Sequence, residues 1–550
     1  MCGILHCFHP DGVDRAQLDK CLARCKSRGP DETQSTTAAN DTLYFGFNRL
    51  AIHDLTATGS QPMTKHGCTL ICNGEIYNCA DLVRRGGYDM MGGSDCEVVL
   101  DLYDDVVRRQ GKSLVEFAEM LDGEFSFVLY DAYRNSTVIA RDPFGVRPLF
   151  ANMVDDHAHH GLLVASTLAC IDDLTSRVQQ FPPGHVAHVY NDTVHVRMYR
   201  YATMTPPPGK RITDPDQALR TIRDTLTRAV EKRLDSEREV CALLSGGLDS
   251  SLVAALAARC LASRGKRLRT FSIGLPGSPD VACARQVASH IRSDHTEVVL
   301  TEAEFLDAIP EVIRAIESYD VTTVRASVGN YLLCKHISEQ TSCKVVLNGD
   351  YSDEVTGGYM YFSNAPHPAA FDKECKRLLH DICYFDSLRS DRCISANGLE
   401  GRTPFADKEF VRAYMSIDPS IRCSEPGKKK RLLRAAFDDT TDLLPAMILW
   451  RPKEAFSDGV SPVTRSWNHV IHDYVMDRVS YREFKERVLH YKDHVTPSTL
   501  EAYLYRKLFA GVFRNDRVIP YQWMPRWVSA NDPSARTIAG YLKHSPEGSA

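Results

Sequence analysis

The sequence has no long hydrophobic run, no excess of positive charge and no repeated or low-complexity tract. No stretch approaches the roughly 18 consecutive apolar residues that a membrane-spanning helix needs, which argues against a membrane partner. Lys and Arg number 66 against 71 Asp and Glu residues, and the net charge of −5 argues against nucleic acid as the main partner. Charged residues make up 25% of the chain and hydrophobic residues 43%, which excludes a disordered chain. In 550 residues we expect two or more globular domains.

The 18 cysteines lack the spacing of a disulfide or zinc framework. Cys21 and Cys25 stand four residues apart, but no paired C-x-x-C set accompanies them. We therefore expect most cysteines to be small apolar side chains in a reducing compartment. The first residues, Met1 to His6, have no basic stretch followed by a long apolar run. We expect no signal peptide and a cytoplasmic protein.

Short alternating hydrophobic runs dominate the chain before residue 205. Gly and Asn residues separate these runs, as is typical of strands joined by turns. Two further segments carry helical spacing. The pattern predicts a layered α+β domain over residues 1–205, with sheets flanked by helices. The predicted strands are 42–47, 68–72, 125–130 and 137–141, and the predicted helices are 17–26 and 96–109.

Three consecutive prolines mark the clearest linker, residues 205–210. After it strands and helices alternate, which predicts an α/β domain with a parallel sheet over residues 211–550, mainly helical after about residue 377. Within that part, the basic segment from Gly427 to Arg431 is interpreted as the solvated start of a helix. The predicted strands are 240–244, 268–273, 296–299 and 344–347, and the predicted helices are 218–234, 251–263, 281–290, 304–318 and 328–341.

Cys2 stands where removal of the initiator Met would leave it as the first residue. Its thiol would then lie beside a free α-amine, whose pKa of about 8 leaves part of it neutral and able to accept the thiol proton. One residue would supply both nucleophile and base, which is the logic of an N-terminal nucleophile. On position alone, an incidental early cysteine is the alternative.

Four other positions in the first domain suit an amino-acid amide as substrate. Asn73 and Gly74 offer a side-chain amide and a backbone N–H, which are the donors of an oxyanion hole. The forked guanidinium of Arg49 suits an α-carboxylate, and Asp95 suits the α-ammonium. Taken singly, each residue is more typical of a turn or a surface, but together they predict a binding site.

The first domain resembles the class II glutamine amidotransferases. Besides Cys2 and the Arg49 segment, the resemblance rests on RGPD at 28–31, NGEIYN at 73–78, LDGEF at 121–125 and RDPFG at 141–145. It implies that Cys2 attacks the glutamine amide while Asn73 and Gly74 hold the oxyanion. The glutamine-binding residues that it implies are Arg49, Leu50, Ala51, Ile52, His53, Asn73, Gly74, Glu75 and Asp95.

A loop rich in Gly and Ser, residues 245–251, follows an apolar strand and precedes a helix. Backbone N–H groups, hydroxyls and the helix N-terminus form an anion site there. Asp249 is out of place in a simple anion site, which indicates that it binds Mg²⁺ on the phosphates. The alternative is a Ser/Gly turn that only caps a helix. The loop resembles the signature of the PP-loop ATP-pyrophosphatases, which implies cleavage of ATP to AMP and pyrophosphate.

Over nearly its full length the chain resembles the glutamine-hydrolysing asparagine synthetases, with segments 317–327 and 450–459 close to that family. The resemblance implies ATP and Mg²⁺ as cofactors, glutamine and aspartate as substrates, and a β-aspartyl-AMP intermediate that ammonia converts to asparagine. Lys453 would contact phosphate and the intermediate, and Asp353 would join Asp249 at the metal. The implied ATP site is Leu243, Ser245, Gly246, Gly247, Asp249, Ser250, Ser251, Ile273, Asn348 and Gly349, and the implied aspartate site is Thr322, Thr323 and Arg325.

One loop departs from the family pattern. The family usually has Ser-Gly-Glu-Gly where this chain has Asn348-Gly349-Asp350-Tyr351. The family glutamate is shortened by one C–C bond, about 1.5 Å, and a glycine is replaced by Tyr351. We expect Asp350 to stay catalytic in a slower enzyme, unless Tyr351 pushes the backbone inward.

Two other functions remain open. One is an ATP-dependent amide ligase for another carboxylic acid, but such relatives typically lose the glutaminase nucleophile, and Cys2 is present here. The other is a non-catalytic regulator that binds glutamine or nucleotide, which only the altered loop at Asp350 and Tyr351 supports. The sequence also leaves a homodimer open.

Overall fold

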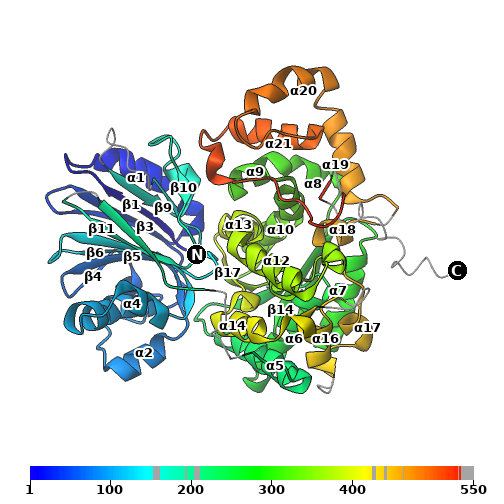
Figure 1. Cartoon of the computed structure of the whole chain (residues 1–550), viewed down its shortest axis with the longest axis horizontal. Helices are drawn as coiled ribbons and strands as arrows, with labels where there is room; N and C mark the ends of the chain where they lie inside the picture. The colour runs from blue at the N-terminus through cyan, green and yellow to red at the C-terminus, as the bar shows by residue number, and fades with distance from the viewer. Residues whose placement is uncertain are drawn as a thin grey trace.

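The computed structural model describes residues 1–152, 161–192, 195–203, 211–423, 429–438, 442–462, 464–529 and 532–533. These residues form two domains that lie side by side, with the N-terminus at the junction between them (Figure 1). The predicted linker 205–210 lies outside the described residues. The domain limits 1–205 and 211–550 therefore stay predictions.

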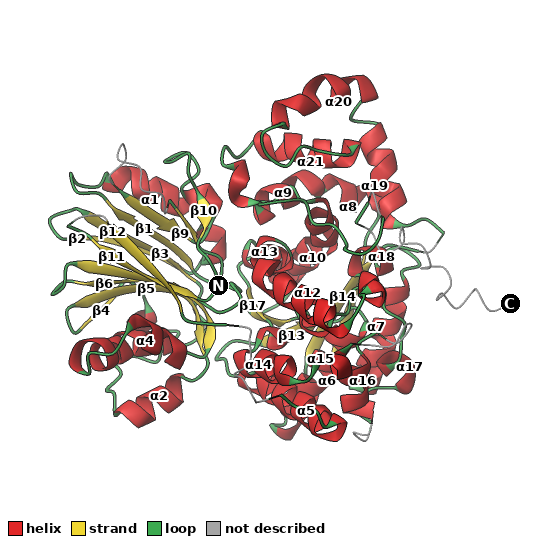
Figure 2. Cartoon of the chain, in the orientation of Figure 1, coloured by secondary structure: helices red, strands yellow, loops and turns green. Residues whose placement is uncertain are grey.

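The first domain contains two six-stranded antiparallel sheets (Figure 2). Ile4 and Phe45 of one sheet meet Val128 and Ile139 of the other in a shared apolar core. The strand order in the first sheet is β10-β8-β9-β1-β3-β2 and in the second β12-β11-β7-β6-β5-β4. The strands are β1 Gly3–Phe8, β2 Glu32–Ala38, β3 Leu43–Arg49, β4 Met63–Lys65, β5 Cys68–Ile76, β6 Gly123–Asp131, β7 Ser136–Arg141, β8 Phe150–Ala151, β9 Leu162–Ala165, β10 Gln179–Gln180, β11 His185–Tyr190 and β12 His195–Arg200.

Helices cover the outer faces of these sheets. Val99 and Phe117 pack on Leu70 and Phe127 of the second sheet, so the layered α+β domain is confirmed. Burying such a side chain stabilises the fold by about 1.5–3 kcal/mol. The helices are α1 Arg15–Ala23, α2 Cys79–Gly86, α3 Val98–Tyr103 and α4 Leu114–Met120.

The second domain has a parallel sheet in the order β15-β14-β13-β16-β17, wrapped by helices. Its strands are β13 Val240–Leu243, β14 Arg269–Gly274, β15 Asp294–Val299, β16 Val345–Leu347 and β17 Glu400–Arg402. The helices against the sheet are α5 Pro215–Lys232, α6 Leu248–Ser263, α7 Pro279–His290, α8 Glu302–Asp307, α9 Ile309–Ile316, α10 Val321–Gln340 and α11 Ser352–Thr356. The rest is mainly helical, as predicted: α12 Pro368–Asp381, α13 Asp386–Ser395, α14 Lys408–Ser416, α15 Pro419–Arg422, α16 Arg431–Asp438, α17 Ala446–Leu449, α18 Phe456–Gly459, α19 Trp467–Met476, α20 Tyr481–Arg487 and α21 Leu500–Ala510.

The second domain differs from the sequence prediction in two helices and one strand. The single helix expected over 304–318 is two helices, because Pro310 has no N–H to continue the first and starts the second. The helix expected from residue 328 begins at Val321, where the Asp320 carboxylate accepts a hydrogen bond from Thr323 N (3.0 Å). The short strand β17 was not expected, since three residues carry too little periodicity to reveal a strand.

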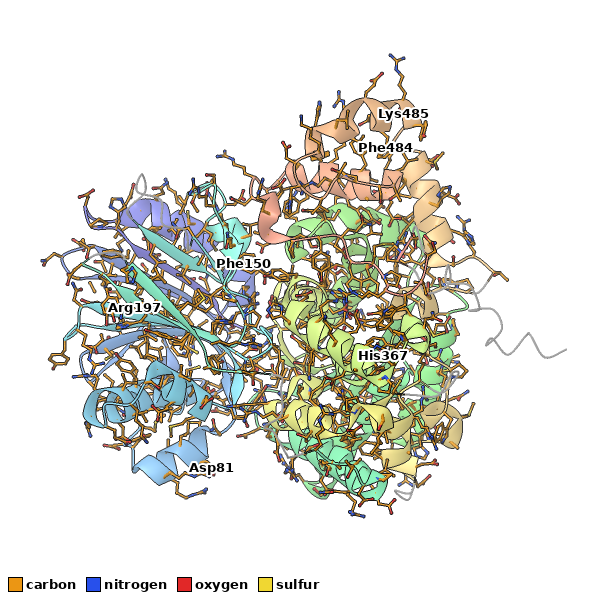
Figure 3. All side chains as sticks on the ribbon, viewed as in Figure 1. Asp81, Phe150, Arg197, His367, Phe484 and Lys485 are labelled. Atoms are coloured by element: carbon orange, nitrogen blue, oxygen red, sulfur yellow. The ribbon has the colours of Figure 1, made fainter. Side chains whose placement is uncertain are left out.

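Buried arginines cross the boundary between the domains. Arg28 pairs with Asp391 at 2.7 Å, and Arg402 of β17 pairs with Glu75 of β5 at 3.2 Å. Phe150, labelled in Figure 3, lies at this boundary with the Arg392 guanidinium 5.2 Å from its ring. The two sites described below are therefore built on elements that contact each other.

Candidate active sites

Cys2 lies immediately before β1, and its Sγ is 3.5 Å from the backbone N of Leu50. Arg28 donates a hydrogen bond from Nε to the Cys2 carbonyl oxygen (3.0 Å). Burial raises the pKa of the Cys2 thiol to about 11, because an apolar setting disfavours the thiolate. The thiol thus needs a base close by to react at neutral pH.

The amine in this structure is that of Met1, and the α-amine of Cys2, which removal of Met1 would free, would lie one residue further along the same buried segment. Burial lowers the pKa of the Met1 ammonium to about 6, although Glu400 lies 3.8 Å away and favours the charged form. The amine is therefore mostly neutral at pH 7, and a neutral amine is the form that accepts a proton.

Asn73 and Gly74 lie within β5, not after it as the sequence suggested, because β5 continues to Ile76. The Asn73 side chain is fully buried, and neither its Oδ1 nor its Nδ2 has a partner among the described residues. Leaving a buried amide unpaired costs about 1–3 kcal/mol. Only glycine fits at Gly74, where a Cβ would lie 2.2 Å from the Glu124 carbonyl oxygen.

Three charged side chains meet near the predicted glutamine pocket. The Glu75 Oε2 lies 3.2 Å from His53 Nε2 and 3.2 Å from an Arg402 nitrogen of the second domain. Burial opposes the charge on His53, but the ion pair with Glu75 prevails and raises the pKa of His53 to about 9. Burial and repulsion from Glu75 raise the pKa of Asp95 to about 7. The Asp95 Oδ2 accepts a hydrogen bond from Ile76 N at 2.5 Å.

The segment after β3 forms a buried wall. Leu50, Ala51 and Ile52 are each buried, and Ala51 N donates to Asp31 Oδ2 (2.8 Å). Arg49 donates from its guanidinium to the carbonyl oxygens of Thr56 (2.7 Å) and Asp54. The guanidinium is held in place by these bonds, and part of its donor set is already used.

The segment 245–251 follows β13, as predicted, but only its first three residues form a connection, because α6 begins at Leu248. Ser250 Oγ lies 3.0 Å from Ser245 Oγ and accepts from Ser245 N at 3.2 Å. Gly246 has φ +71°, and a Cβ there would lie 2.5 Å from Ala284 N, so only glycine fits. Gly247 is the N-cap of α6, and Ser251 Oγ is buried without a partner among the described residues.

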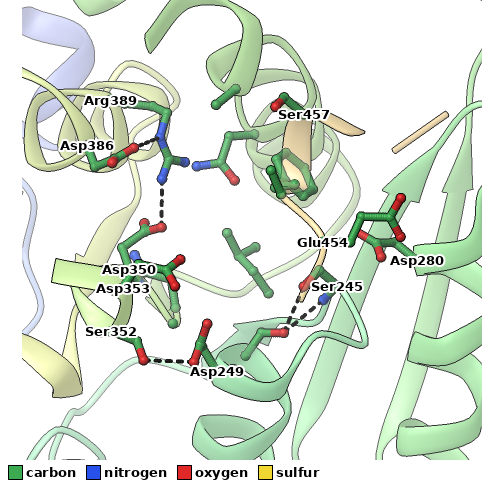
Figure 4. A pocket seen from close by; sticks show the side chains of 18 of the residues that line it. Ser245, Asp249, Asp280, Asp350, Ser352, Asp353, Asp386, Arg389, Glu454 and Ser457 are labelled. Atoms are coloured by element: carbon green, nitrogen blue, oxygen red, sulfur yellow. Dashed lines mark hydrogen bonds and ion pairs between the residues drawn. The ribbon is translucent and has the colours of Figure 1, made fainter. Parts of the chain in front are cut away.

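A cavity opens beside this loop (Figure 4). It brings together much of the predicted ATP site, but Gly246, Gly247 and Ser251 do not border it. Gly349 approaches the loop so closely that a Cβ would lie 2.7 Å from Ser250 N. The predicted residues that line the cavity are Leu243, Ser245, Asp249, Ser250, Ile273, Thr322, Asn348, Gly349, Asp350, Asp353 and Lys453.

Two carboxylates and two lysines form a cluster at one side of the cavity. Lys453 Nζ lies 2.6 Å from Asp353 and 3.9 Å from Asp249. Lys430 Nζ lies 2.7 Å from Asp249 and 2.6 Å from Asp353. Burial disfavours the charge on Asp353, but the two lysines prevail and hold the pKa of that carboxyl well below its usual range.

Lys430 corrects one sequence interpretation. The basic segment 427–431 was expected to be solvated, but Lys430 is only 2% exposed and Lys429 8%. Residues 427 and 428 lie outside the described residues. Lys430 reaches Asp249 from 181 positions away in sequence, so no local pattern distinguished it from a surface lysine.

Asp350 also lines the cavity and is paired with Arg389 at 2.7 Å. Arg389 also holds Asp386 at 3.0 Å, and the dashed lines in Figure 4 join Arg389 to both carboxylates. The sequence analysis missed Arg389 and Asp386, because only the packing of α13 brings them to the cavity. Asn330, whose Nδ2 is buried and unpartnered among the described residues, also lines the cavity and was missed.

The residues of α10 that were predicted to bind aspartate do not all face the same place in the structure. Thr322 lines the cavity, and its Oγ1 is buried and unpartnered among the described residues. Thr323 instead donates to Asp320 (2.8 Å). Arg325 is bound to Glu501 and Asp532, at 2.6 and 2.7 Å, and does not border the cavity. Thr323 and Arg325 thus make contacts within the protein, and their place in the aspartate site stays a prediction.

Comparisons with known proteins decide the family. A family model described as asparagine synthase matches residues 221–370 and 363–529, and one described as glutamine amidotransferase domain matches residues 1–194. The chain is 39% identical over 567 residues to the glutamine-hydrolyzing asparagine synthetase of Gallus gallus, covering 98% of this chain and 99% of that protein. The chain belongs to this family. The Mus musculus and Homo sapiens proteins of the same description are 39% and 38% identical over 568 residues, at 98% of this chain and 99% of each relative.

Within the asparagine synthetase family, the departure at Tyr351 now has a structural description. Tyr351 has φ +74°, a left-handed conformation that glycine adopts at little cost. Its side chain is 1% exposed, its hydroxyl donates to Ser387 Oγ, and its ring packs against Phe144 of the first domain. The extra side chain is thus accommodated between the domains.

None of the described helices is both long enough and apolar enough to cross a membrane.

Proposed function

We infer that this chain converts aspartate to asparagine, using ATP and ammonia released from glutamine. One observation carries the inference: the relatives that share 39% of their residues with this chain over 98% of its length are glutamine-hydrolyzing asparagine synthetases. The motifs for both half-reactions also fold into buried sites, at Cys2 and beside loop 245–251. Neither alternative function, a ligase for another acid or a regulator, is favoured by an observation of this kind.

For glutamine hydrolysis we assign Cys2 as the nucleophile. Its thiol proton passes to the α-amine, and Sγ attacks the amide carbon of glutamine. The Asn73 amide and the Gly74 N–H donate to the oxyanion, for which the unpartnered Asn73 side chain is a support. The C–N bond then breaks, ammonia leaves with a proton, and water hydrolyses the thioester to glutamate.

For glutamine binding we assign the α-ammonium to Asp95 and Glu75 and the α-carboxylate to Arg49. The two carboxylates lie close enough for repulsion to raise the pKa of Asp95, and a substrate cation between them relieves that repulsion. Leu50, Ala51, Ile52 and His53 form the wall beside this position. The ion pair between His53 and Glu75 supports placing both residues at one site.

For adenylation we assign loop 245–251 as the binding site of the ATP phosphates. The side-chain carboxylate of aspartate attacks the α-phosphorus, and the bond to pyrophosphate breaks. Lys453 and Lys430 supply positive charge where negative charge develops. Ammonia then attacks the acyl carbon, AMP leaves, and asparagine forms. Asp350 is assigned either to the formation of the aspartyl-adenylate or to the attack of ammonia.

We propose Mg²⁺ as the metal, held by Asp249 and Asp353. No cluster of three or more His, Cys, Asp or Glu side chains that would cage a metal occurs among the described residues. Mg²⁺ is usually held by one or two carboxylates and by substrate phosphates, so the pair fits. When bound, the ion would neutralise charge on the phosphates.

The remaining assignments are proposals from the sequence alone. We place the protein in the cytoplasm, for which the 18 free cysteines are a support. A homodimer is testable by light scattering of the purified protein. A nucleic-acid partner is not expected, given the net charge of −5.

The deciding experiment measures pyrophosphate release from ATP against a panel of carboxylic acids, with glutamine or ammonia as the nitrogen donor. Release with aspartate and no other acid supports the proposal, with asparagine identified as the product. Release with a different acid would assign the ligase function. No release with any acid, in the presence of bound glutamine or ATP, would assign the regulator.

Cys2→Ala separates the two half-reactions. We expect glutamine hydrolysis and glutamine-dependent synthesis to fall by at least about 10⁴-fold, because the nucleophile is lost. Ammonia-dependent synthesis should stay within about twofold of the parent, because the second cavity is intact. The matched control is Cys7→Ala on β1, the strand that follows Cys2, which should retain both activities. Equal loss of both activities in Cys2→Ala would contradict two separable sites.

A further inference from the structure

Tyr351 connects the two active-site regions through its side chain. Its backbone neighbours belong to the synthetase cavity, since Asp350 pairs with Arg389 and Ser352 donates to Asp249 (2.7 Å). The Tyr351 hydroxyl donates to Ser387 Oγ, and Ser387 Oγ in turn donates to the carbonyl oxygen of Gly145 in the first domain (2.9 Å). Residue 351 is therefore connected to both domains, to one by its backbone neighbours and to the other by its side chain.

The ring of Tyr351 makes a second contact with the first domain. Its centroid lies 6.5 Å from that of Phe144, at an interplanar angle of 71°, an edge-to-face arrangement that is favourable for aromatic pairs. Tyr351 is 1% exposed and Phe144 3%, so the contact is fully desolvated. The left-handed backbone at φ +74° costs about 1–2 kcal/mol for a residue with a Cβ, and these contacts offset it.

The partner segment, loop 141–147, is itself rigid. The Asp142 carboxylate accepts hydrogen bonds from the backbone N of Phe144 (3.0 Å) and of Arg147 (2.9 Å). The Gly145 carbonyl accepts from Arg141 as well (3.0 Å). A loop closed in this way is a firm support for whatever packs on it.

The far end of loop 141–147 reaches the glutaminase site. Arg147 is 1% exposed, pairs with Glu124 at 3.1 Å and lies 3.9 Å from Asp391, which pairs with Arg28. Arg28 in turn donates to the Cys2 carbonyl oxygen (3.0 Å), so this short segment is linked to the nucleophile through two side chains, while Phe144 touches Tyr351 beside Asp350.

The same hydroxyl also acts on the partner of Asp350. Ser387 and Arg389 lie on α13, two residues apart, and Arg389 holds the Asp350 carboxylate at 2.7 Å. A shift of α13 would move Arg389, and a shift of residue 351 would move Asp350, so either would disturb that ion pair. A displacement of about 1 Å in a catalytic group can lower the rate about 100-fold.

We propose that Tyr351 is a positioning residue, which fixes Asp350 for the synthetase reaction and links its position to loop 141–147 of the glutaminase domain. The proposal rests on the proposed function, because it assumes that Asp350 acts in asparagine synthesis. It does not require Tyr351 to touch a substrate.

The test compares Tyr351→Phe and Ser387→Ala with the parent protein. Both remove the hydroxyl bridge but keep the buried packing, so both should fold. We expect each to lower kcat for pyrophosphate release about threefold to tenfold, the effect of one net hydrogen bond, with KM for ATP unchanged. Asparagine formed per glutamine hydrolysed should fall by a similar factor, while glutamine hydrolysis without ATP stays at the parent rate.

The matched control is Tyr361→Phe. Tyr361 is equally buried and donates to Glu374 (2.9 Å), but it does not border the synthetase cavity. It should lose stability without changing the ratio of asparagine to glutamine hydrolysed. The double variant Tyr351→Phe with Ser387→Ala should lose no more than either single variant, because both break one bridge.

The outcomes separate this proposal from the proposed function. A parent protein that forms neither pyrophosphate nor asparagine from aspartate, ATP and glutamine would overturn the proposed function. An active parent whose Tyr351→Phe and Ser387→Ala variants keep kcat and the product ratio would overturn only the role of Tyr351. Equal losses in Tyr361→Phe would overturn it too, since the effect would then be one of general stability.

Discussion

Asp249, Asp353, Lys430 and Lys453 form a cluster with no net formal charge. Two partly buried carboxylates at such close range repel each other, and each lysine lies within 4 Å of both. The lysines therefore balance the carboxylates before ATP binds. Under the proposed function, they would supply positive charge to the ATP phosphates, and the carboxylates would be the metal ligands.

Lys430→Gln is expected to impair adenylation and leave glutamine hydrolysis unchanged. The glutamine side chain keeps the size of lysine but supplies no charge to the phosphates, and pyrophosphate release should fall on the order of 100-fold. Steady-state assays of both half-reactions measure this. Lys429→Gln, at the neighbouring position outside the cluster, is the control and should release pyrophosphate near the parent rate. An active Lys430→Gln variant would mean that Lys453 alone serves the phosphates.

If Asp95 binds the glutamine ammonium as proposed, we expect glutamine use to depend on pH. Burial and repulsion from Glu75 raise the pKa of Asp95 to about 7, so the carboxyl is neutral below that pH and charged above it. A charged Asp95 attracts the glutamine ammonium. The value of kcat/KM for glutamine should therefore fall as the pH drops below 7, which gives the pH profile an acidic limb. Ammonia-dependent synthesis does not use Asp95, so its pH profile should lack the limb that Asp95 causes.

Two variants check the assignment to Asp95. Asp95→Asn should raise KM for glutamine at all pH values and abolish the limb near pH 7. His53→Ala removes a cation that favours the charged form of Asp95, so the limb should move to higher pH. A limb that stays in place in Asp95→Asn would assign it to another group.

Among the elements, the turn from β13 to α6 shows how backbone geometry selects residues. Gly246 has φ +71° and no room for a Cβ beside Ala284 on α7. Gly247 is different, because its φ of −74° is ordinary and a Cβ there would meet only Ser245 Oγ at 3.3 Å. The first glycine is required by the fold, whereas the second is replaceable.

Gly246→Ala should disturb the phosphate loop, while Gly247→Ala serves as its control. Alanine at 246 incurs a left-handed backbone cost of about 1–2 kcal/mol and displaces either the loop or α7. We expect a lower Tm and a loss of pyrophosphate release of at least about tenfold for Gly246→Ala, and a near-parent Tm for Gly247→Ala. Calorimetry and the pyrophosphate assay measure the two effects. Equal behaviour of the variants would show that the loop adapts freely.

At the scale of the whole molecule, the domain boundary forms part of the glutaminase site. Arg28 links the carbonyl of Cys2 to Asp391, and Arg402 approaches the Glu75 carboxylate from β17. Both arginines are at most 2% exposed. Removing one partner of a buried ion pair leaves the other charge uncompensated, at a cost of about 3–5 kcal/mol.

Arg402→Met should therefore weaken glutamine binding from the other domain. Without Arg402, Glu75 has only His53 as its cation, and KM for glutamine should rise about tenfold. Arg422→Met is the control, because Arg422 is equally buried and pairs with Asp372 away from the domain boundary. Both variants should lose Tm, but only Arg402→Met should change KM. A control that raises KM equally would contradict the specific contact.

The sequence predicted the elements with clear periodicity and the residues that lie in local motifs. Loop 245–251 and the strand before it appear where expected, because the residues that form this site are consecutive. Lys430, Arg389 and β17 were missed, since each matters only through partners that are distant in the chain. The place of Arg325 near a substrate, which the family resemblance implied, stays a prediction, and its ion pairs with Glu501 of α21 and with Asp532 could not be read from the sequence.

The sequence by itself determined the two-domain α+β and α/β architecture, the position of Cys2 and the phosphate loop. Hydrophobic periodicity and consecutive motifs are local properties, so they can be recognised without coordinates. The tertiary structure decided which charges meet: Lys430 with Asp249 and Asp353, Arg389 with Asp350, and Arg402 with Glu75. It also decided that Tyr351 packs between the domains. Such contacts depend on how separate elements pack, and a charge reveals its partner only once burial has removed the solvent around both.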